Sequence, residues 1–179
     1  MFVAGIVLLS LVLAATLQAK LYQEHAEQLL QNEINAASTG TTLIPVAPIK
    51  ENALLGRLDI PRIGVSVAVL QGTGSRTLRL GAGHIENTSL PGQSGNVGIA
   101  GHRDTYFRPL RDIRRNDRIQ LQTATGQFQY QVDWIKIVSP DDVSVLAASG
   151  ESALTLVTCY PFQFLGSAPK RFIVRAHRY

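Results

Sequence analysis

The sequence predicts an all-β barrel with one or two short helices, preceded by an N-terminal transmembrane helix. Most of the chain after residue 54 consists of short apolar runs, several with the period-two alternation of half-buried strands. Turn residues separate these runs, and helix-forming stretches are scarce among them. The first 19 residues, in contrast, are uncharged and almost continuously apolar.

The composition is that of an ordinary globular protein of about one domain's length, and it excludes disorder and collagen-like repeats. The chain has 179 residues, of which 45% are hydrophobic and 17% are charged. A formal net charge of +4 is too small to name a partner. The single cysteine, Cys159, excludes an intrachain disulfide and a Cys-based zinc site, and in an exported chain an odd thiol points to reactivity or intermolecular pairing.

Residues 1–19 predict a transmembrane anchor, because this uncharged run is just long enough to cross a hydrocarbon core of about 30 Å. A cleaved signal peptide is the alternative, although residues 17–19 make a poor cleavage site and no basic region precedes the run. Leu21, Leu29, Leu30 and Ile34 then follow roughly helical spacing, so we expect residues 20–37 to form a helical stalk. Residues 38–53 lack a period and predict a linker or an extended segment.

Residues 54–179 form the predicted folded domain. The valines of 65–70 and the aromatic and apolar residues of 128–138 show the clearest alternation. Ser139 as an N-cap, Pro140 and two aspartates predict a short helix over the following residues. The predicted strands are 58–60, 65–70, 97–100, 119–123, 128–138, 154–159 and 172–176.

Three reactive side chains lie where predicted strands end or begin. Cys159 ends an apolar run, His102 follows the glycine-flanked strand 97–100, and Arg171 opens the last strand. If the strands that carry Cys159 and Arg171 pair antiparallel, these two residues share one edge of the barrel. Taken singly, Cys159 is most simply an inert core thiol, His102 a structural residue and Arg171 a surface residue. Together they are the parts of thiol acyl transfer: a nucleophile, a proton carrier and a cation for the oxyanion.

The residues around these three positions resemble the signature regions of sortases, most closely those of class D. The likeness covers residues 54–179 and the N-terminal anchor. In the family's order, the matching stretches are Gly56-Arg57-Leu58-Asp59-Ile60-Pro61, Leu80-Gly81-Ala82-Gly83-His84, Gly95-Asn96-Val97-Gly98-Ile99-Ala100-Gly101-His102-Arg103-Asp104, Thr155-Leu156-Val157-Thr158-Cys159-Tyr160-Pro161-Phe162 and Pro169-Lys170-Arg171-Phe172-Ile173-Val174.

The resemblance implies a closed eight-stranded barrel on the extracytoplasmic side of the cell membrane, held by a single-pass anchor. It implies a cysteine transpeptidase that cleaves a Leu-Pro-x-Thr-type sorting signal and joins the new carboxyl end to an amine of peptidoglycan or of a pilin. By position, Cys159 carries the thioacyl intermediate, His102 acts as acid and base, and Arg171 binds near the scissile carbonyl. This agrees with the chemistry of thiols, since the thiolate is the nucleophile and needs a nearby cation or proton acceptor.

Several further expectations follow. Thr158, Tyr160 and Phe107 are candidates for substrate binding, although residues of these types are more often part of the core. We expect no cofactor, no obligatory metal and no nucleic acid partner, without excluding a bound calcium.

Three alternatives to a sortase-like transpeptidase remain. One is a thiol protease, and another is a different thiol acyl transferase such as an L,D-transpeptidase, whose Ser-His-Gly-Cys signature is missing. The third is an anchored binding module with an inert buried thiol.

Overall fold

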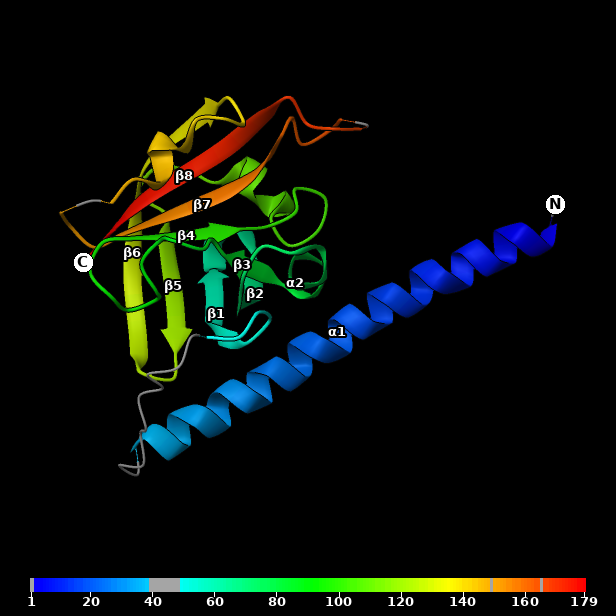
Figure 1. Ribbon diagram of the computed structural model, residues 1–179, viewed down its shortest axis with the longest axis horizontal. Coiled ribbons are helices and arrows are strands. Elements are labelled where there is room, and N and C mark those ends of the chain that lie inside the picture. The colour runs from blue at the N-terminus through cyan, green and yellow to red at the C-terminus, as the bar shows by residue number, and fades with distance from the viewer. Residues whose placement is uncertain (1, 39–48, 149, 165) are drawn as a thin grey trace.

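The computed structural model describes residues 2–38, 49–148, 150–164 and 166–179. A long N-terminal helix precedes eight strands that close into a barrel (Figure 1), which confirms the predicted all-β class. In chain order the elements are α1 (Phe2–Ser38), β1 (Leu54–Ile60), η1 (Pro61–Ile63), β2 (Val65–Gln71), α2 (Ser75–Leu80), β3 (Ala82–His84), β4 (Asn96–Ala100), η2 (Arg108–Asp112), β5 (Arg118–Thr123), β6 (Gly126–Val138), η3 (Val143–Leu146), β7 (Ala153–Tyr160) and β8 (Lys170–Arg178).

Around the barrel the strands follow the order β1-β2-β3-β4-β7-β8-β6-β5. The pairs β2–β3 and β4–β7 are parallel, and every other neighbouring pair is antiparallel. Strands β4 and β7 are neighbours in the sheet although β5 and β6 lie between them in the chain. The chain therefore brings two distant sequence motifs onto adjacent parallel strands.

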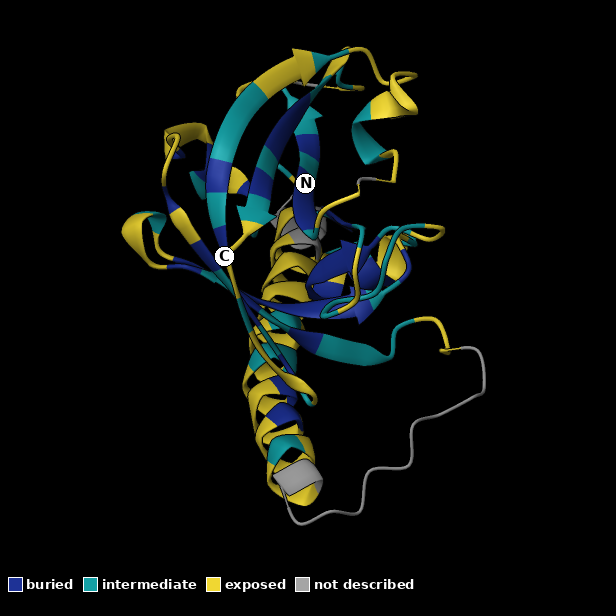
Figure 2. Ribbon diagram, turned by 90° about the vertical axis from the view of Figure 1, so that its left-hand side faces the viewer, coloured by how far each residue is buried: buried dark blue, intermediate teal, exposed yellow. Residues whose placement is uncertain are grey.

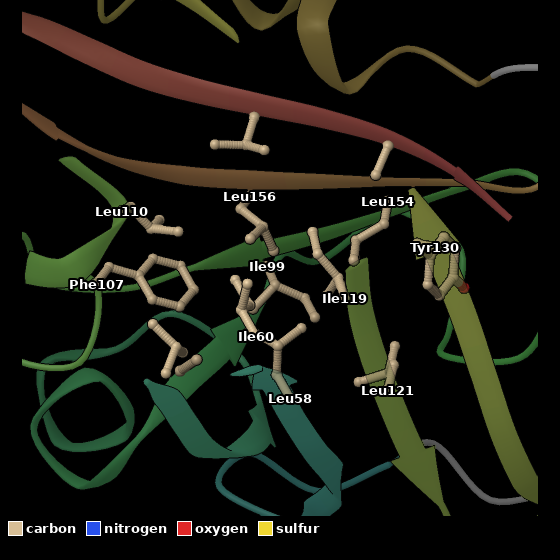
Figure 3. Close-up of a cluster of buried hydrophobic side chains, with 14 of the residues drawn as sticks. Leu58, Ile60, Ile99, Phe107, Leu110, Ile119, Leu121, Tyr130, Leu154 and Leu156 are labelled. Carbon is tan, nitrogen blue, oxygen red and sulfur yellow. The ribbon is translucent and has the colours of Figure 1, made fainter. Parts of the chain in front are cut away.

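The interior of the barrel is filled by the apolar side chains of alternate strand positions (Figure 3). Leu154 and Leu156 of β7 are completely buried, and they face Leu58 of β1 and Leu121 of β5 within one cluster. Each such side chain contributes about 1.5–3 kcal/mol through its removal from water. The alternation in β7 also determines on which face of the sheet Cys159 lies, because it turns the odd-numbered residues 155, 157 and 159 to the outer face.

Three elements differ from the sequence-based expectations. Strand β3 and helix α2 were not predicted, because elements of three and six residues are too short to show a period. The short helix after β6 exists, but it is a 3₁₀ turn that begins at Val143, and Asp142 instead of Ser139 caps it. The Asp142 carboxylate accepts a hydrogen bond from the Ser144 backbone N–H at 3.2 Å. The aspartate nearest the turn therefore takes the capping role.

Helix α1 is continuous through the segments predicted as anchor and stalk, and its second half lies against the barrel (Figures 1 and 2). Ala26 and Leu30 are buried there. Gln23 fixes the contact, because its side chain accepts a hydrogen bond from the Ala68 N–H at 2.8 Å and donates one to the Leu80 carbonyl at 2.5 Å. The outer face of β2 is thus covered, which explains why Ala68 is buried as well as the inward-facing valines.

In the first half of α1, the large apolar side chains that the structure describes are exposed (Figure 2), namely Ile6, Val7, Leu9, Leu11, Val12, Leu13 and Leu17. Among the described residues, one helical segment, Gly5–Ala36, is long and apolar enough to cross a membrane. The predicted linker 38–53 falls largely on residues 39–48, which lie outside the described part of the chain. The chain is described again from residue 49, and β1 begins at Leu54.

Candidate active site

Strand register places Cys159, His102 and Arg171 at one level of the barrel. In the parallel pair β4–β7, Ala100 lies beside Val157. Cys159 is two residues further along β7, and His102 follows two residues after Ala100, just past the end of β4, so both residues lie at the same edge. In the antiparallel pair β7–β8, Cys159 lies directly opposite Arg171, as the sequence suggested. Cys159 therefore stands on the middle strand, with the histidine on one side and the arginine on the other.

The three side chains share one cavity of about 340 Å³. Cys159 and Arg171 are half-buried, whereas His102 is exposed at the mouth. The loop between β7 and β8 closes one wall through Gly166, Ser167 and Ala168, and Arg103 and Asp104 complete the rim on the His102 side. A thiol that opens into a polar cavity beside two basic side chains is unlike an inert core cysteine.

Arg171 is held by backbone carbonyls of the wall loop. Its Nη1 atom donates to the Ala168 carbonyl at 3.3 Å and to its neighbour Lys170 at 3.1 Å. Because a guanidinium carries five N–H donors in a rigid plane, these bonds fix its orientation while engaging only one of its nitrogens. The guanidinium is thus held at the cavity that also contains Cys159.

The position of His102 depends on a buried contact behind it. The Thr158 hydroxyl donates to the Gly101 carbonyl at 2.7 Å, and the Gly101 N–H donates to the Val157 carbonyl at 3.1 Å. Gly101 also packs so closely on Phe107 that a Cβ atom would come within 2.6 Å of the Phe107 ring. Only glycine fits this approach. The residue before His102 is therefore fixed from β7 and from the core.

Arg103 is a site residue that the sequence analysis did not single out. Its guanidinium donates to the carbonyls of Pro161 at 3.0 Å, Phe164 at 2.7 Å and Gly166 at 3.2 Å. It also lies 5.8 Å from the centroid of the Phe164 ring. Arg103 thus connects the loop that carries His102 to the loop that follows Cys159. Its position directly after the histidine is the only sequence signal for this role.

The three residues suggested for substrate binding differ in how accessible they are. Phe107 is fully buried in the core and Thr158 is 2% exposed, so neither presents a surface to a bound peptide. We therefore assign them supporting roles behind His102. Tyr160 is half-buried at the end of β7, where its ring lies 6.1 Å from Phe162 and 6.2 Å from Phe172.

A second polar network lies on the same outer face, four residues from Cys159 along β7. Arg175 donates to the Thr155 hydroxyl at 2.9 Å, and that hydroxyl donates to the Asn96 amide oxygen at 2.8 Å. Asn96 and Arg175 both reach the Val145 carbonyl in η3. Burial lowers the pKa of Arg175, which is held against the strands by these contacts. The network holds η3 over the strands that carry the site.

The described part of the chain contains no group of three His, Cys, Asp or Glu side chains arranged to hold a metal ion. His84 is buried at the end of β3. Its ring nitrogens lie 3.0 Å from the Gln71 amide oxygen and 2.9 Å from the Ser89 carbonyl. Burial lowers the pKa of His84, so the neutral imidazole is favoured there.

The structure is a closed eight-stranded barrel with Cys, His and Arg at the ends of three adjacent strands, the arrangement of a class of cysteine-dependent barrel proteins. Comparison with known proteins shows which family within this class the chain matches. Residues 58–179 match the family model described as the Sortase domain. Sortase D of Bacillus subtilis is 37% identical over 124 residues, which cover 69% of this chain and 63% of that protein. Sortase A of Bacillus anthracis is 26% identical over 132 residues, or 72% of this chain and 61% of that one.

Solved structures agree with this result. A Sortase D5 transpeptidase of Clostridium perfringens superposes with a TM-score of 0.72 and 30% identity, covering 89% of this chain and 97% of that chain. The pilus-related Sortase C of Group B Streptococcus gives a TM-score of 0.67 and 27% identity, covering 90% of this chain and 93% of that one. The chain belongs to the sortase family. It spans about three fifths of the length of the curated relatives it matches.

Proposed function

We propose that this protein is a membrane-anchored cysteine transpeptidase. It cleaves a sorting signal of the Leu-Pro-x-Thr type through a thioacyl intermediate on Cys159 and transfers the acyl group to an amine in the cell envelope. The observation that carries the proposal is the convergence of Cys159, His102 and Arg171 in one cavity at one level of the barrel. Membership of the sortase family and the likeness to the Sortase D5 transpeptidase of Clostridium perfringens support it.

In the first half of the reaction, the Cys159 thiolate attacks the scissile carbonyl carbon and forms the S–C bond. The carbonyl electrons move to oxygen, where the Arg171 guanidinium stabilises the developing negative charge. When the C–N bond breaks, His102 gives its proton to the departing amine. The acyl group is then held as a thioester on Cys159, and His102 is neutral.

In the second half, an acceptor amine attacks the thioester carbonyl. Neutral His102 takes the proton that the attacking nitrogen must lose, and the C–S bond breaks to restore the thiolate of Cys159. The histidine thus returns to its starting protonation state. His102 lies at the mouth of the cavity, where an incoming amine meets it first.

The first half of α1 supports the membrane part of the proposal. Its uncharged residues 2–19 span about 27 Å as a helix, close to the thickness of a hydrocarbon core. The loop between β7 and β8 and the N-terminal end of α1 lie toward the same side of the molecule (Figure 1). With the proposed anchoring, the loop that lines the cavity with Cys159 is on the side of the barrel nearer the membrane.

The proposal is tested by incubating the protein with a sorting-signal peptide, with and without an amine such as triglycine or diaminopimelate, and following the products by mass spectrometry. We expect an acyl adduct on Cys159 and, with the amine present, a ligated product. Cys159→Ala should abolish both. Ser167→Ala serves as the matched control, since Ser167 lines the same cavity without a part in the chemistry.

Each of the other possible outcomes would assign a different function to this protein. An adduct that persists in Cys159→Ala refutes the assignment of the nucleophile. Hydrolysed peptide alone, in the presence of excess amine, indicates a thiol protease. Negligible labelling of Cys159 by a thiol reagent in the folded protein indicates a binding module with an unreactive thiol.

A further inference from the structure

A second and larger cavity lies between α1 and the barrel, on the side of the first half of the helix. Its volume is about 610 Å³, within the range of about 300–1,000 Å³ that is typical of small-molecule sites. Val12, Ala15 and Ala19 form its helical wall, and Thr105 and Tyr106 form the barrel wall. None of its lining residues contributes to the cavity that contains Cys159. We call this cavity the α1 groove.

The α1 groove is a fixed part of the fold. Gln23, one turn after Ala19, bonds to the Ala68 N–H and the Leu80 carbonyl. The Tyr106 hydroxyl donates to the same Leu80 carbonyl at 3.1 Å. Because a continuous helix transmits its orientation along its axis, these bonds also fix the position of the preceding turns.

The groove has an apolar wall and a cationic rim. From Val12 to Lys20 the helix rises about 12 Å, so the wall runs along the last part of the uncharged segment. Lys20 and Arg79 line the cavity where that segment ends. The single carboxylate of the lining, Glu24, lies one turn beyond Lys20.

This pattern matches the two chemical parts of a membrane lipid. A hydrocarbon chain fits a narrow apolar wall at membrane depth, and an anionic phosphate fits the cations at the surface. Tyr106 has an apolar ring and a polar hydroxyl, the combination favoured at the membrane interface. A free phosphate would use the rim but leave the apolar wall empty.

We propose that the α1 groove binds one phospholipid with an anionic headgroup, whose acyl chain lies along Val12, Ala15 and Ala19 and whose phosphate lies between Lys20 and Arg79. The inference rests on the membrane anchoring in the proposed function. The bound lipid contacts Thr105 and Tyr106, which belong to the loop that begins at His102. It therefore seats the barrel on the bilayer by the end that carries the site.

The experiment uses the full chain in vesicles of phosphatidylcholine and phosphatidylglycerol. A phosphatidylglycerol probe with a photoreactive group on its acyl chain is activated, and the labelled peptides are identified by mass spectrometry. Any lipid around the anchor can label α1, so the informative label is on the barrel peptide that contains Thr105 and Tyr106. We expect that label from the phosphatidylglycerol probe and a several-fold weaker one from a phosphatidylcholine probe.

Two variants test the two parts of the groove. Lys20→Gln combined with Arg79→Gln should lower the barrel label at least ten-fold, because each cation near an anionic lipid surface contributes a factor of about five. Ala19→Phe fills the groove without a change of charge and should also lower the label. Arg115→Gln combined with Arg118→Gln is the matched control, since both cations are exposed and neither lines the groove.

The outcomes separate this inference from the anchoring on which it rests. Flotation with the vesicles reports anchoring, and we expect it for the wild type and every variant. Barrel labelling that is unchanged in the Lys20 and Arg79 variant, that falls equally in the control, or that is equally strong from the phosphatidylcholine probe overturns the lipid site. A wild-type chain that does not float contradicts the anchoring, and the lipid site with it.

Discussion

The hydrogen bond from Thr158 to the Gly101 carbonyl gives a direct test of how the fold positions His102. Thr158→Val keeps the branched shape of the side chain and removes only the hydroxyl. Because both groups are buried, the substitution leaves the Gly101 carbonyl without this donor, at a cost of about 1–2 kcal/mol. For a domain of this size, that loss lowers Tm by roughly 4–10 °C.

The same substitution should affect turnover through the residue that follows Gly101. A shift of about 1 Å in a catalytic group can lower the rate about a hundred-fold, so we expect kcat to fall ten- to a hundred-fold. KM should change little, since Thr158 does not line the cavity that contains Cys159. The assay is cleavage of a fluorogenic sorting-signal peptide well below Tm, together with thermal unfolding followed by circular dichroism.

Thr158→Ser is the matched control, because it retains the hydroxyl and loses only a methyl group. We expect it to keep most of the activity. The reasoning is refuted if Thr158→Val unfolds at the same temperature as Thr158→Ser and turns over substrate equally fast. A fall in Tm without a fall in kcat would limit the role of this bond to stability.

Three further predictions concern titrating groups and the helix contact. Burial alone would raise the pKa of Asp117, but hydrogen bonds from Arg62 and from the Arg114 N–H lower it. Ionised Asp117 therefore stabilises the fold above about pH 4, and this stability is lost as pH falls through the folded-state pKa. Asp117→Asn should lower Tm at pH 7, and the difference in Tm from the wild type should shrink as pH falls below about 4. Burial lowers the pKa of His84, so below about pH 6.5 the unfolded chain binds a proton at this residue and the folded chain does not. Tm should therefore decrease as pH falls below about 6.5. An equally steep decrease in His84→Gln would contradict this. Gln23→Ala removes two hydrogen bonds from the helix contact and should accelerate amide hydrogen exchange at Ala68 about ten-fold, whereas an unchanged rate would show that apolar packing alone holds α1 in place.

The barrel was largely predictable from the sequence because its longer strands carry a strong alternation. The buried residues Val67, Tyr130 and Val132 are all members of runs whose period indicated a half-buried strand. Short elements lacked enough residues to show a period, which is why β3 and α2 were missed. Their position follows from their neighbours in the sheet and against α1, and such contacts are invisible in one sequence.

The candidate site divides in the same way. The alignment of Cys159 with Arg171 was predictable, since it needs only the assumption that consecutive strands pair antiparallel. The position of His102 beside Cys159 was not predictable, because it depends on the parallel pairing of β4 with β7, two strands separated by more than fifty residues. The roles of Arg103 and Arg175 were also hidden, since their partners lie far away in the sequence. Arg103 donates to backbone carbonyls of the loop after β7, and Arg175 donates to the Thr155 hydroxyl and the Val145 carbonyl. Backbone acceptors leave no mark in a sequence.

The pairing of Ala100 with Val157 has a consequence for engineering this barrel. A single residue inserted into β4 or β7 would shift one partner by about 3.3 Å and turn it to the opposite side of the sheet. The spacing of the reactive atoms would be lost without any change in their identity. Loop 161–169 carries no constraint from strand pairing, but it lines the cavity with Cys159 and its carbonyls hold Arg103 and Arg171. Both the strands and this loop should therefore be kept at constant length when the protein is redesigned.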